Sequence, residues 1–509
     1  METLQLLMQG MQQIFLPVNM LMIVFGGFLG LIVGALPGLG SVAGCALLLP
    51  LTYKMNPTSA IIMLSALYYG NMFGGAISAI LINIPGDAPA VMTALDGYPM
   101  TRNGQAGKAL FVAFSSSFIG GLIGAIIITC LGTTMARIGL AFGSPELAML
   151  ILLAMTSIGW MLGESPAKGL AVTGLGLLLA TIGFDPINQG KARMCFGSTY
   201  LMGGIPFIPA IIGLFGFSQI IKTLADGIDK QPPVENRKLR IRDSVPKREE
   251  FKSLVPTQLR GSLIGFFVGL LPGSGATTAS FLTYIVEKRI NKKGDAMGTG
   301  IPEGIAVSES SNNAASIGAF VPLLSLGIPG SGTAAVLLGG LMMWGLQPGP
   351  LFMSKNPELC WSLIASLFIG DILIAILCIL LIPFMSNVLK VPNKILVPIV
   401  FCVCMLGAYC VNTNIKDLYT MVIAGCFGFI FIKYKLPLAP MVLAMVLGET
   451  LEKSIRQGLL MGRGSAKIFF TRPLSLGIFI FGVIFSLLPV FVGIIKKNKE
   501  KQNSNGGSQ

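Results

Sequence analysis

Long apolar stretches alternate with short polar connections along most of the chain. Several of these stretches reach ~18–25 residues, the length that an α-helix needs to cross the hydrocarbon core of a bilayer. Apolar spans are expected near 58–86, 109–136, 143–162, 169–184 and 200–222, with a last one at Ser475–Ile495. The pattern predicts an all-α polytopic membrane protein with about 10–12 transmembrane segments.

Two of the apolar stretches are interrupted by the same motif. The first copy reads Gly34-Ala-Leu-Pro-Gly-Leu-Gly40, and the second reads Gly269-Leu-Leu-Pro-Gly-Ser-Gly275. Proline lacks an N–H donor and clashes with the preceding turn, so the helix must break at each copy. Lipid cannot satisfy the backbone groups that a break frees, so each break must be sheltered in protein or line a wet cavity. A pair of such breaks at corresponding places is typical of a transporter binding site.

Other signatures recur in the same order on either side of the polar segment Asp226–Lys252. Gly74 and Ile84-Pro85-Gly86 are matched by Gly318 and Ile328-Pro329-Gly330. We infer a tandem duplication. The chain then divides into a first transmembrane repeat (1–225), a polar cytoplasmic loop (226–258), a second repeat (259–470), and an extra C-terminal helix with a cytoplasmic tail (471–509).

The placement of basic residues predicts how the two repeats are oriented. The second motif lies in a segment, Gly261–Glu287, with basic residues at both ends, so we expect a hairpin that enters and leaves on the cytoplasmic side. The first copy follows a stretch without Lys or Arg and precedes the lone Lys54, which suits the opposite side. We therefore expect inverted repeats, each with a re-entrant or broken helical hairpin. Arg137, Lys191 and Arg193 fall on the outer side in this scheme, against the charge bias, and so does the basic stretch from Lys453 to Arg472.

Composition excludes several classes of protein. Hydrophobic residues make up 53% of the chain and charged residues 11%, and the net charge of +14 gathers in a few polar loops rather than in a nucleic-acid-binding patch. Histidine is absent, which excludes histidine-ligated zinc sites, Ser-His hydrolases and histidine proton relays. The glycine-rich motifs lack the lysine of a nucleotide-binding loop, so no cofactor is expected and transport must use ion or solute gradients.

The first group of candidate binding residues surrounds the two breaks. Helices that restart after a break direct their N–H groups and a partial charge of roughly +0.5 toward an anion. Carbonyl groups freed beside Gly38 and Gly273 could coordinate Na⁺. The alternative is that the small residues only permit close helix packing. The candidates are Pro37, Gly38, Gly40, Ser41, Pro272, Gly273, Ser274, Gly275, Thr277 and Thr278.

A second group follows each hairpin. A carboxylate and amides beside an apolar stretch are costly unless they face a cavity. The alternative is a solvated loop with helix-capping Ser and Asn, in which Asp87 and Asp96 would be surface residues. The candidates are Glu309, Asn312, Asn313, Pro329, Gly330, Ser331 and Thr333, with Asn71, Pro85 and Gly86 as their first-repeat counterparts.

These motifs resemble the large membrane subunit of tripartite tricarboxylate transporters. The resemblance covers nearly the whole chain, although position 71 holds Asn where the family more often has a short hydroxyl residue. The segments that carry it are Leu36-Pro-Gly-Leu-Gly40, Thr93-Ala-Leu-Asp-Gly-Tyr-Pro-Met100, Glu309-Ser-Ser-Asn-Asn-Ala-Ala315 and Leu326-Gly-Ile-Pro-Gly-Ser-Gly-Thr333.

The resemblance implies a multi-pass permease of the bacterial inner membrane. Its expected partners are a small four-helix membrane subunit, a periplasmic solute-binding protein and membrane lipid, but no nucleic acid. The expected activity is secondary active uptake of citrate-like tricarboxylates or related carboxylates, coupled to Na⁺ or H⁺, and the chain is expected not to be an enzyme. A channel, an intramembrane enzyme acting on a lipid-phosphate substrate and a structural scaffold are the alternatives. Neighbouring genes for the two partner proteins would separate the permease from a channel.

Overall fold

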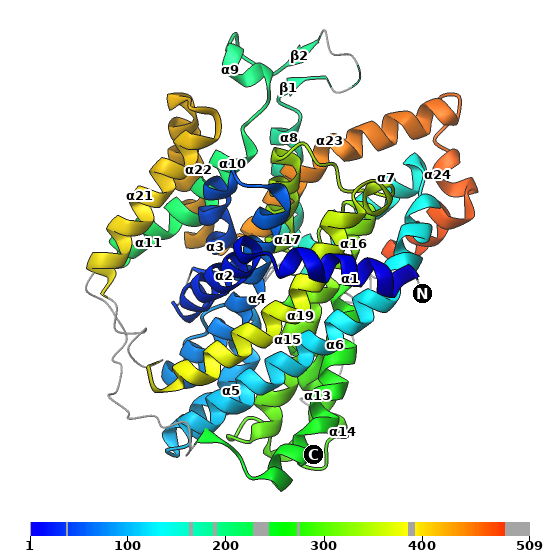
Figure 1. Ribbon diagram of the computed structural model, residues 1–509. Helices are drawn as coiled ribbons and strands as arrows, with labels where there is room; N and C mark the ends of the chain where they lie inside the picture. Colours follow the sequence, from blue (N-terminus) through cyan, green and yellow to red (C-terminus); the bar gives the residue numbers. More distant parts are fainter. Residues whose placement is uncertain are drawn as a thin grey trace, which may run out of the picture.

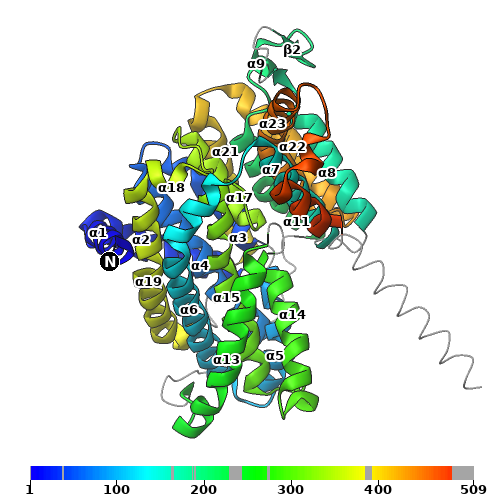
Figure 2. The ribbon, with the colours of Figure 1, turned by 90° about the vertical axis from the view of Figure 1, so that its right-hand side faces the viewer.

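The computed structural model describes residues 2–36, 39–161, 166–185, 187, 191–227, 244–271, 275–384 and 392–483 (Figure 1). Helices account for most of this part of the chain. The strands described form a two-stranded antiparallel ladder in which Gly183 of β1 pairs with Arg193 of β2. Both views place this ladder and α9 at one end of the molecule and the outer ends of α13 and α14 at the other (Figures 1 and 2).

The elements before the polar segment are α1 (Glu2–Ile14), α2 (Pro17–Ala35), α3 (Gly40–Leu48), η1 (Leu49–Thr52), α4 (Pro57–Ile82), η2 (Ala88–Ala90), α5 (Val91–Arg102), α6 (Ala106–Leu140), α7 (Ser144–Met161), α8 (Pro166–Ala180), β1 (Gly183–Phe184), β2 (Ala192–Arg193), α9 (Thr199–Met202), α10 (Phe207–Ile211), the π-helical η3 (Ile212–Phe217) and α11 (Ser218–Asp226).

The elements after it are α13 (Arg248–Gly269), α14 (Gly275–Ile290), η4 (Gly294–Ala296), α15 (Pro302–Gly318), α16 (Phe320–Leu326), α17 (Gly332–Met343), α18 (Phe352–Lys355), α19 (Pro357–Leu381), η5 (Ile382–Phe384), α21 (Asn393–Asn412), α22 (Ile415–Lys433), α23 (Leu438–Met461) and α24 (Ile468–Thr471). A further apolar helix covers Pro473–Val483.

The prediction of an all-α polytopic membrane protein is confirmed. Among the described residues, six helices are long and apolar enough to cross a membrane. The five spans expected in the first part correspond to α4, α6, α7, α8 and α10–α11, although the pattern missed the short helix α5 between the first two. The predicted C-terminal span, Ser475–Ile495, is described only as far as residue 483.

Two helices form the centre of the molecule. Every residue of α4 from Ser59 to Ile80 is buried, and so is every residue of α15 from Glu303 to Gly318. Helix α4 starts at Pro57 behind the N-cap Asn56, whose side chain accepts a hydrogen bond from the Thr58 N–H (2.9 Å). Glu309, Asn312 and Asn313 therefore lie inside a buried helix, and the alternative of a solvated loop is wrong for these three residues.

Each broken hairpin packs its first helix against one of these central helices. Helix α2 contacts α4 through Gly30, where an added Cβ would lie 2.3 Å from the Leu67 carbonyl oxygen. Helix α13 contacts α15 through Gly265, where an added Cβ would lie 2.4 Å from the Ser311 carbonyl oxygen. The predicted breaks are therefore two equivalent hairpins, α2–α3 and α13–α14, each held by a close glycine contact. Whether the repeats are inverted stays a prediction.

Candidate functional site

The two breaks share an unusual backbone conformation. Gly40, the first residue of α3, has φ +62°, and Gly275, the first residue of α14, has φ +61°. Only glycine adopts this left-handed region without a steric cost, which explains the last glycine of each motif. Five candidate residues, Pro37, Gly38, Pro272, Gly273 and Ser274, lie outside the described residues, and so do the carbonyls proposed for Na⁺.

A chain of hydrogen bonds joins the first hairpin to both repeats. The Ser41 Oγ and backbone N–H both donate to Oδ2 of Asp87, at 2.8 and 3.0 Å. Asp87 follows the Ile-Pro-Gly motif of the first repeat. The Thr333 Oγ1, on α17 of the second repeat, donates to the Ser41 Oγ at 2.8 Å. We call Ser41, Asp87 and Thr333, together with Ser331, the motif cluster.

The second hairpin reaches the same place from another direction. Ser331 is the N-cap of α17: its Oγ accepts from the Ala334 N–H (3.2 Å) and lies 3.1 Å from the Tyr68 hydroxyl. A Cβ on Gly275 would lie 3.7 Å from the Ser331 Cβ. On the next turn of α14, the Ser280 Oγ donates to the Pro89 carbonyl oxygen (3.0 Å). The tips of both hairpins therefore meet the cluster.

The two Ile-Pro-Gly loops hold the hairpins at their breaks. The Gly86 N–H donates to the Gly75 carbonyl oxygen (3.3 Å), and a Cβ on Gly86 would lie 1.7 Å from the Gly34 carbonyl oxygen. In the second repeat a Cβ on Gly330 would lie 3.0 Å from the Gly269 carbonyl oxygen. Pro85 is half-buried and Pro329 is buried. These glycines let the loop backbone touch the end of the preceding half-helix.

Glu309 forms a separate buried network on α15. Its carboxylate accepts from the Thr93 hydroxyl, from the Ser117 Oγ (3.0 Å) and from the Asn312 Nδ2 (3.1 Å). The Asn313 Nδ2 donates to the Asn312 Oδ1 (2.7 Å). Helices α5 and α6 supply Thr93 and Ser117, so the network joins the two repeats. Hydroxyl and amide donors, rather than a lysine or arginine, satisfy this carboxylate.

Three further polar candidates belong neither to the motif cluster nor to the Glu309 network. Thr277 and Thr278 are half-buried on α14. Asn71 is fully buried on α4, and neither its Oδ1 nor its Nδ2 has a hydrogen-bond partner. A buried amide without partners is costly, so Asn71 is a polar group available to an ion or a polar ligand.

Sequence reasoning missed Asp87 and Tyr68 as residues of the site, and the alternative that places Asp96 at the surface is wrong. The pattern allows Asp87 to be a surface residue, yet its carboxylate accepts hydrogen bonds at the N-terminus of α3, and no motif singles out Tyr68. Their signals were the position of Asp87 directly after Ile-Pro-Gly and an aromatic hydroxyl inside an apolar span. Asp96 is also buried, but it has a structural role: its Oδ1 accepts from the N–H groups of Gly298, Gly300 and Ile301.

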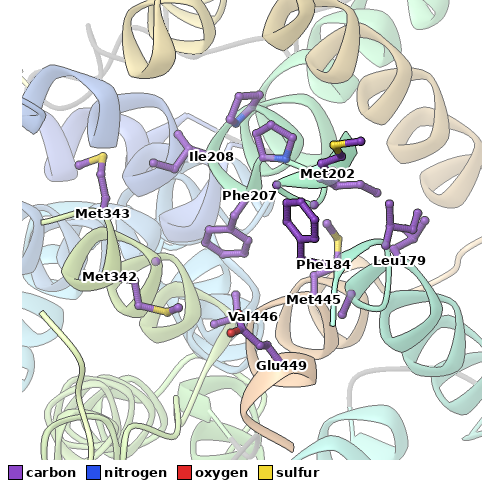
Figure 3. Close-up of a pocket in the computed structure, with 18 of the residues that line it drawn as sticks. Leu179, Phe184, Met202, Phe207, Ile208, Met342, Met343, Met445, Val446 and Glu449 are labelled. Carbon is purple, nitrogen blue, oxygen red and sulfur yellow. The ribbon is translucent and has the colours of Figure 1, made fainter. Parts of the chain in front are cut away.

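A cavity of about 910 Å³ opens at the end of the molecule that carries β1 and β2 (Figure 3). Its lining includes Phe207 of α10, Met342 of α17, and Met445 and Glu449 of α23. None of the candidate residues lines it. Helix α17 connects the two places, because it begins at the motif cluster and its last turns line the cavity.

The helical fold and the paired broken hairpins define a polytopic membrane protein of the type that transports solutes. The chain belongs to the tripartite tricarboxylate transporter TctA family, whose model matches residues 20–443. It is therefore a membrane permease of that family.

Two relatives from Agrobacterium vitis are similar to the chain. The "Uncharacterized 52.8 kDa protein in TAR-I ttuC' 3'region" is 37% identical over 492 residues, which cover 96% of this chain and 97% of the relative. The "Uncharacterized protein in TAR-II ttuC' 3'region" is 38% identical over 228 residues, which cover 44% of this chain and 94% of that protein. No solved structure matches the chain.

Proposed function

We propose that the protein carries out secondary active uptake of citrate-like tricarboxylates or related carboxylates across the bacterial inner membrane. In this proposal a periplasmic solute-binding protein delivers the substrate, a small membrane subunit accompanies the permease, and a Na⁺ or H⁺ gradient drives uptake. The observation that carries the proposal is the motif cluster, where both hairpin tips and both Ile-Pro-Gly loops meet.

The N-terminus of α3 provides the chemistry for binding a carboxylate. Its first turn presents free N–H groups and the positive end of the helix dipole. One of these groups, the Ser41 N–H, already donates to a carboxylate, that of Asp87. Substrate carboxylates offer the same acceptor, and Ser331 at the N-terminus of α17 adds a second anchor a short distance away. We infer that substrate binds between these two helix ends.

The charge of the site favours coupling to a cation. Asp87 and Glu309 are acidic, and no lysine or arginine is buried among the described residues. A multivalent anion that approaches these carboxylates in a medium of low dielectric constant meets strong repulsion. A cation bound at the same time removes it and couples the two gradients. The unpaired Asn71 amide and the carbonyls beside Gly38 and Gly273 are candidate ligands for Na⁺.

We place the end that carries β1 and β2 in the periplasm. Two of the outward basic residues that conflict with the charge bias have acidic partners there: Arg193 pairs with Glu452, and Arg456 pairs with Asp185, both at 2.8 Å. Phe196, beside β2, is 87% exposed and offers an apolar contact for a docking protein. The 910 Å³ cavity then serves as the entrance, and an elevator-like movement of the two hairpins gives alternating access.

The test is gradient-driven uptake of radiolabelled citrate, and of a panel of other carboxylates, into vesicles that contain all three components. Ser41→Ala removes a hydrogen bond to a charged group, worth about 1.5–3 kcal/mol, so uptake should fall roughly tenfold or more. Ser354→Ala, on the exposed surface of α18, is the control and should leave uptake unchanged.

Two results would count against the proposal. The first is uptake that persists when both the Na⁺ and the H⁺ gradients are collapsed, because a channel would behave in that way. The second is a Ser41→Ala variant that transports every carboxylate of the panel like the unaltered protein.

A further inference from the structure

The acidic side chains of the protein interior have a partner in all cases but one. Eight acidic residues are buried among the described residues: Asp96, Glu146, Asp185, Glu287, Glu303, Glu309, Asp371 and Asp417. Four form ion pairs: Glu146 with Arg472, Asp185 with Arg456, Glu287 with Arg260 and Glu303 with Lys293. Asp96, Glu309 and Asp417 accept hydrogen bonds from hydroxyl, amide or backbone donors. Asp371 is the exception.

Asp371 lies in the middle of the apolar helix α19. It is about 21 Å from the start of this 25-residue helix, at a rise of 1.5 Å per residue. Its side chain is 3% exposed, its Oδ2 has no hydrogen-bond partner, and no described residue forms an ion pair with it. A carboxyl group in this position is costly and is a functional-site candidate by default.

Asp371 lies where corresponding segments of the two repeats touch. Helix α6 carries Phe118-Ile-Gly-Gly121, and helix α19 carries Phe368-Ile-Gly-Asp371 at the corresponding place of the second repeat. The two segments touch: a Cβ on Gly121 would lie 2.4 Å from Oδ1 of Asp371 and 2.7 Å from its Oδ2. Gly121 is the first-repeat residue that corresponds to Asp371. Because Gly121 has no side chain, the Asp371 carboxyl group can occupy the space beside it.

Few titratable groups face Asp371 from the helices around it. Helix α4 contributes Tyr69, whose hydroxyl donates to the Ser366 carbonyl oxygen (3.2 Å), and α19 itself contributes the buried Cys378. Helix α2 and η5 contain no titratable residue. The titratable residues of α6, Lys108, Cys130 and Arg137, lie far along that helix on either side of Gly121, and α1 and α18 add only Glu2 and Lys355 at helix ends.

Helix α6 also links Asp371 to the Glu309 network on α15. Its Ser117, one turn before Gly121, donates to Glu309 of α15 (3.0 Å), and its Gly120 packs on the Ser310 backbone. Among the four buried carboxyl groups of the described residues that lack an ion-pair partner, Glu309 and Asp371 thus lie on the α15 side and the α19 side of one helix. A change of charge at Asp371 acts on the same helix that holds the Glu309 network.

We propose that Asp371 binds and releases a proton during each transport cycle, so that the proton is a coupling ion. The inference rests on the proposed function and specifies its energy source. A proton is the cation that this site can accept, because a metal ion would need several oxygen ligands. The groups that face the carboxyl are instead the Gly121 backbone and the Tyr69 hydroxyl, which already has a partner, and the Cys378 thiol lies two turns further along α19. Proton release requires the α6–α19 contact to open.

The experiment measures proton and carboxylate movement together in reconstituted vesicles. The vesicles contain the complete three-component system and a trapped pH dye, and radiolabelled citrate, or the best substrate of the panel, is the probe. In the unaltered protein, an outside-acid gradient should increase uptake, and added substrate should acidify the interior. Asp371→Asn should exchange external for internal substrate at equal pH but should show neither acidification nor a response to the gradient.

Two control variants separate a proton site from a packing role. Glu358→Gln makes the same change at an exposed carboxylate on the same helix and should behave like the unaltered protein. Asp371→Glu should restore acidification at least in part. If Asp371→Asn acidifies the vesicles normally, or loses substrate exchange as well, the proton inference is wrong.

The inference and the proposed function fail in different ways. If the unaltered protein takes up substrate with Na⁺ alone and without acidification, the proton inference is overturned and the proposed function stands. If the unaltered protein transports no carboxylate under any gradient, the proposed function fails.

Discussion

At the scale of single residues, both halves of the chain start the second helix of the hairpin with a glycine in the left-handed conformation. Gly40 and Gly275 both start a helix with φ close to +60°, directly after a Pro-Gly break. At Gly275 there is room for a side chain, because the nearest atom to an added Cβ would be 3.7 Å away. These glycines are therefore required by conformation, whereas Gly30 and Gly265 are required by packing.

Replacing Gly275 with alanine should destabilise the second hairpin by about 1–2 kcal/mol, the cost of a left-handed conformation for a residue with a Cβ. We expect a lower melting temperature in detergent and reduced uptake. Gly174→Ala is the matched control, because this helical glycine of α8 has open space around it and alanine favours helix. A Gly275→Ala variant as stable as Gly174→Ala would show that the left-handed conformation is not needed.

At the scale of elements, contacts between helix backbones hold the hairpins. Helices α2 and α4, and likewise α13 and α15, approach so closely that the carbonyl groups of one helix touch the glycine Cα atoms of the other. Small residues at regular spacing permit this approach in membrane proteins, where lipid gives no hydrophobic drive for helix association. The central helices can then carry polar side chains, because neighbouring helices shield them from lipid.

Gly30→Ala should force α2 away from α4, because the new Cβ would lie 2.3 Å from the Leu67 carbonyl oxygen. Overpacking of this kind costs about 1–3 kcal/mol, so we expect a lower melting temperature and a weaker first hairpin. Gly477→Ala, in the exposed C-terminal helix with no atom within 4 Å of its added Cβ, should not change the melting temperature. Equal melting temperatures for the two variants would contradict the close contact.

At the scale of the whole molecule, ion pairs occur at both ends. At the end with β1 and β2, Arg193 and Arg456 are paired with Glu452 and Asp185. At the other end Arg260 and Lys293 are paired with Glu287 and Glu303, while Lys292 is exposed. A paired cation carries little net charge, so it weakens the charge bias that sets topology.

Cysteine labelling tests which end of the molecule faces the periplasm. Phe196→Cys should react with a membrane-impermeant maleimide added to intact cells whose outer membrane is permeabilised, because we place β1 and β2 in the periplasm. Lys292→Cys should react only in inside-out vesicles. The natural cysteines set the background, which is measured in the unaltered protein. Reaction of Phe196→Cys only in inside-out vesicles, with Lys292→Cys reacting in the permeabilised cells, would contradict this orientation.

The fold class and part of the site could be predicted because they depend on local properties. Apolar length requires membrane spans, and Pro-Gly within such a span requires a break, whatever the rest of the chain does. For the same reason Ser41, Ser331 and Thr333 could be named from their positions beside breaks. Asp87 could not be placed, since an acidic residue after a turn is as compatible with solvent as with a helix N-terminus.

The sequence by itself determined the class of the protein, its two hairpins and the glycines that start their second helices, because these follow from the covalent limits of proline and glycine and from the thickness of a bilayer. Only the tertiary structure decided which polar groups meet. The bond between Ser41 and Thr333 joins residues 292 positions apart, and the contact between Gly121 and Asp371 joins two repeats. Such pairs depend on how helices cross, which no local pattern specifies.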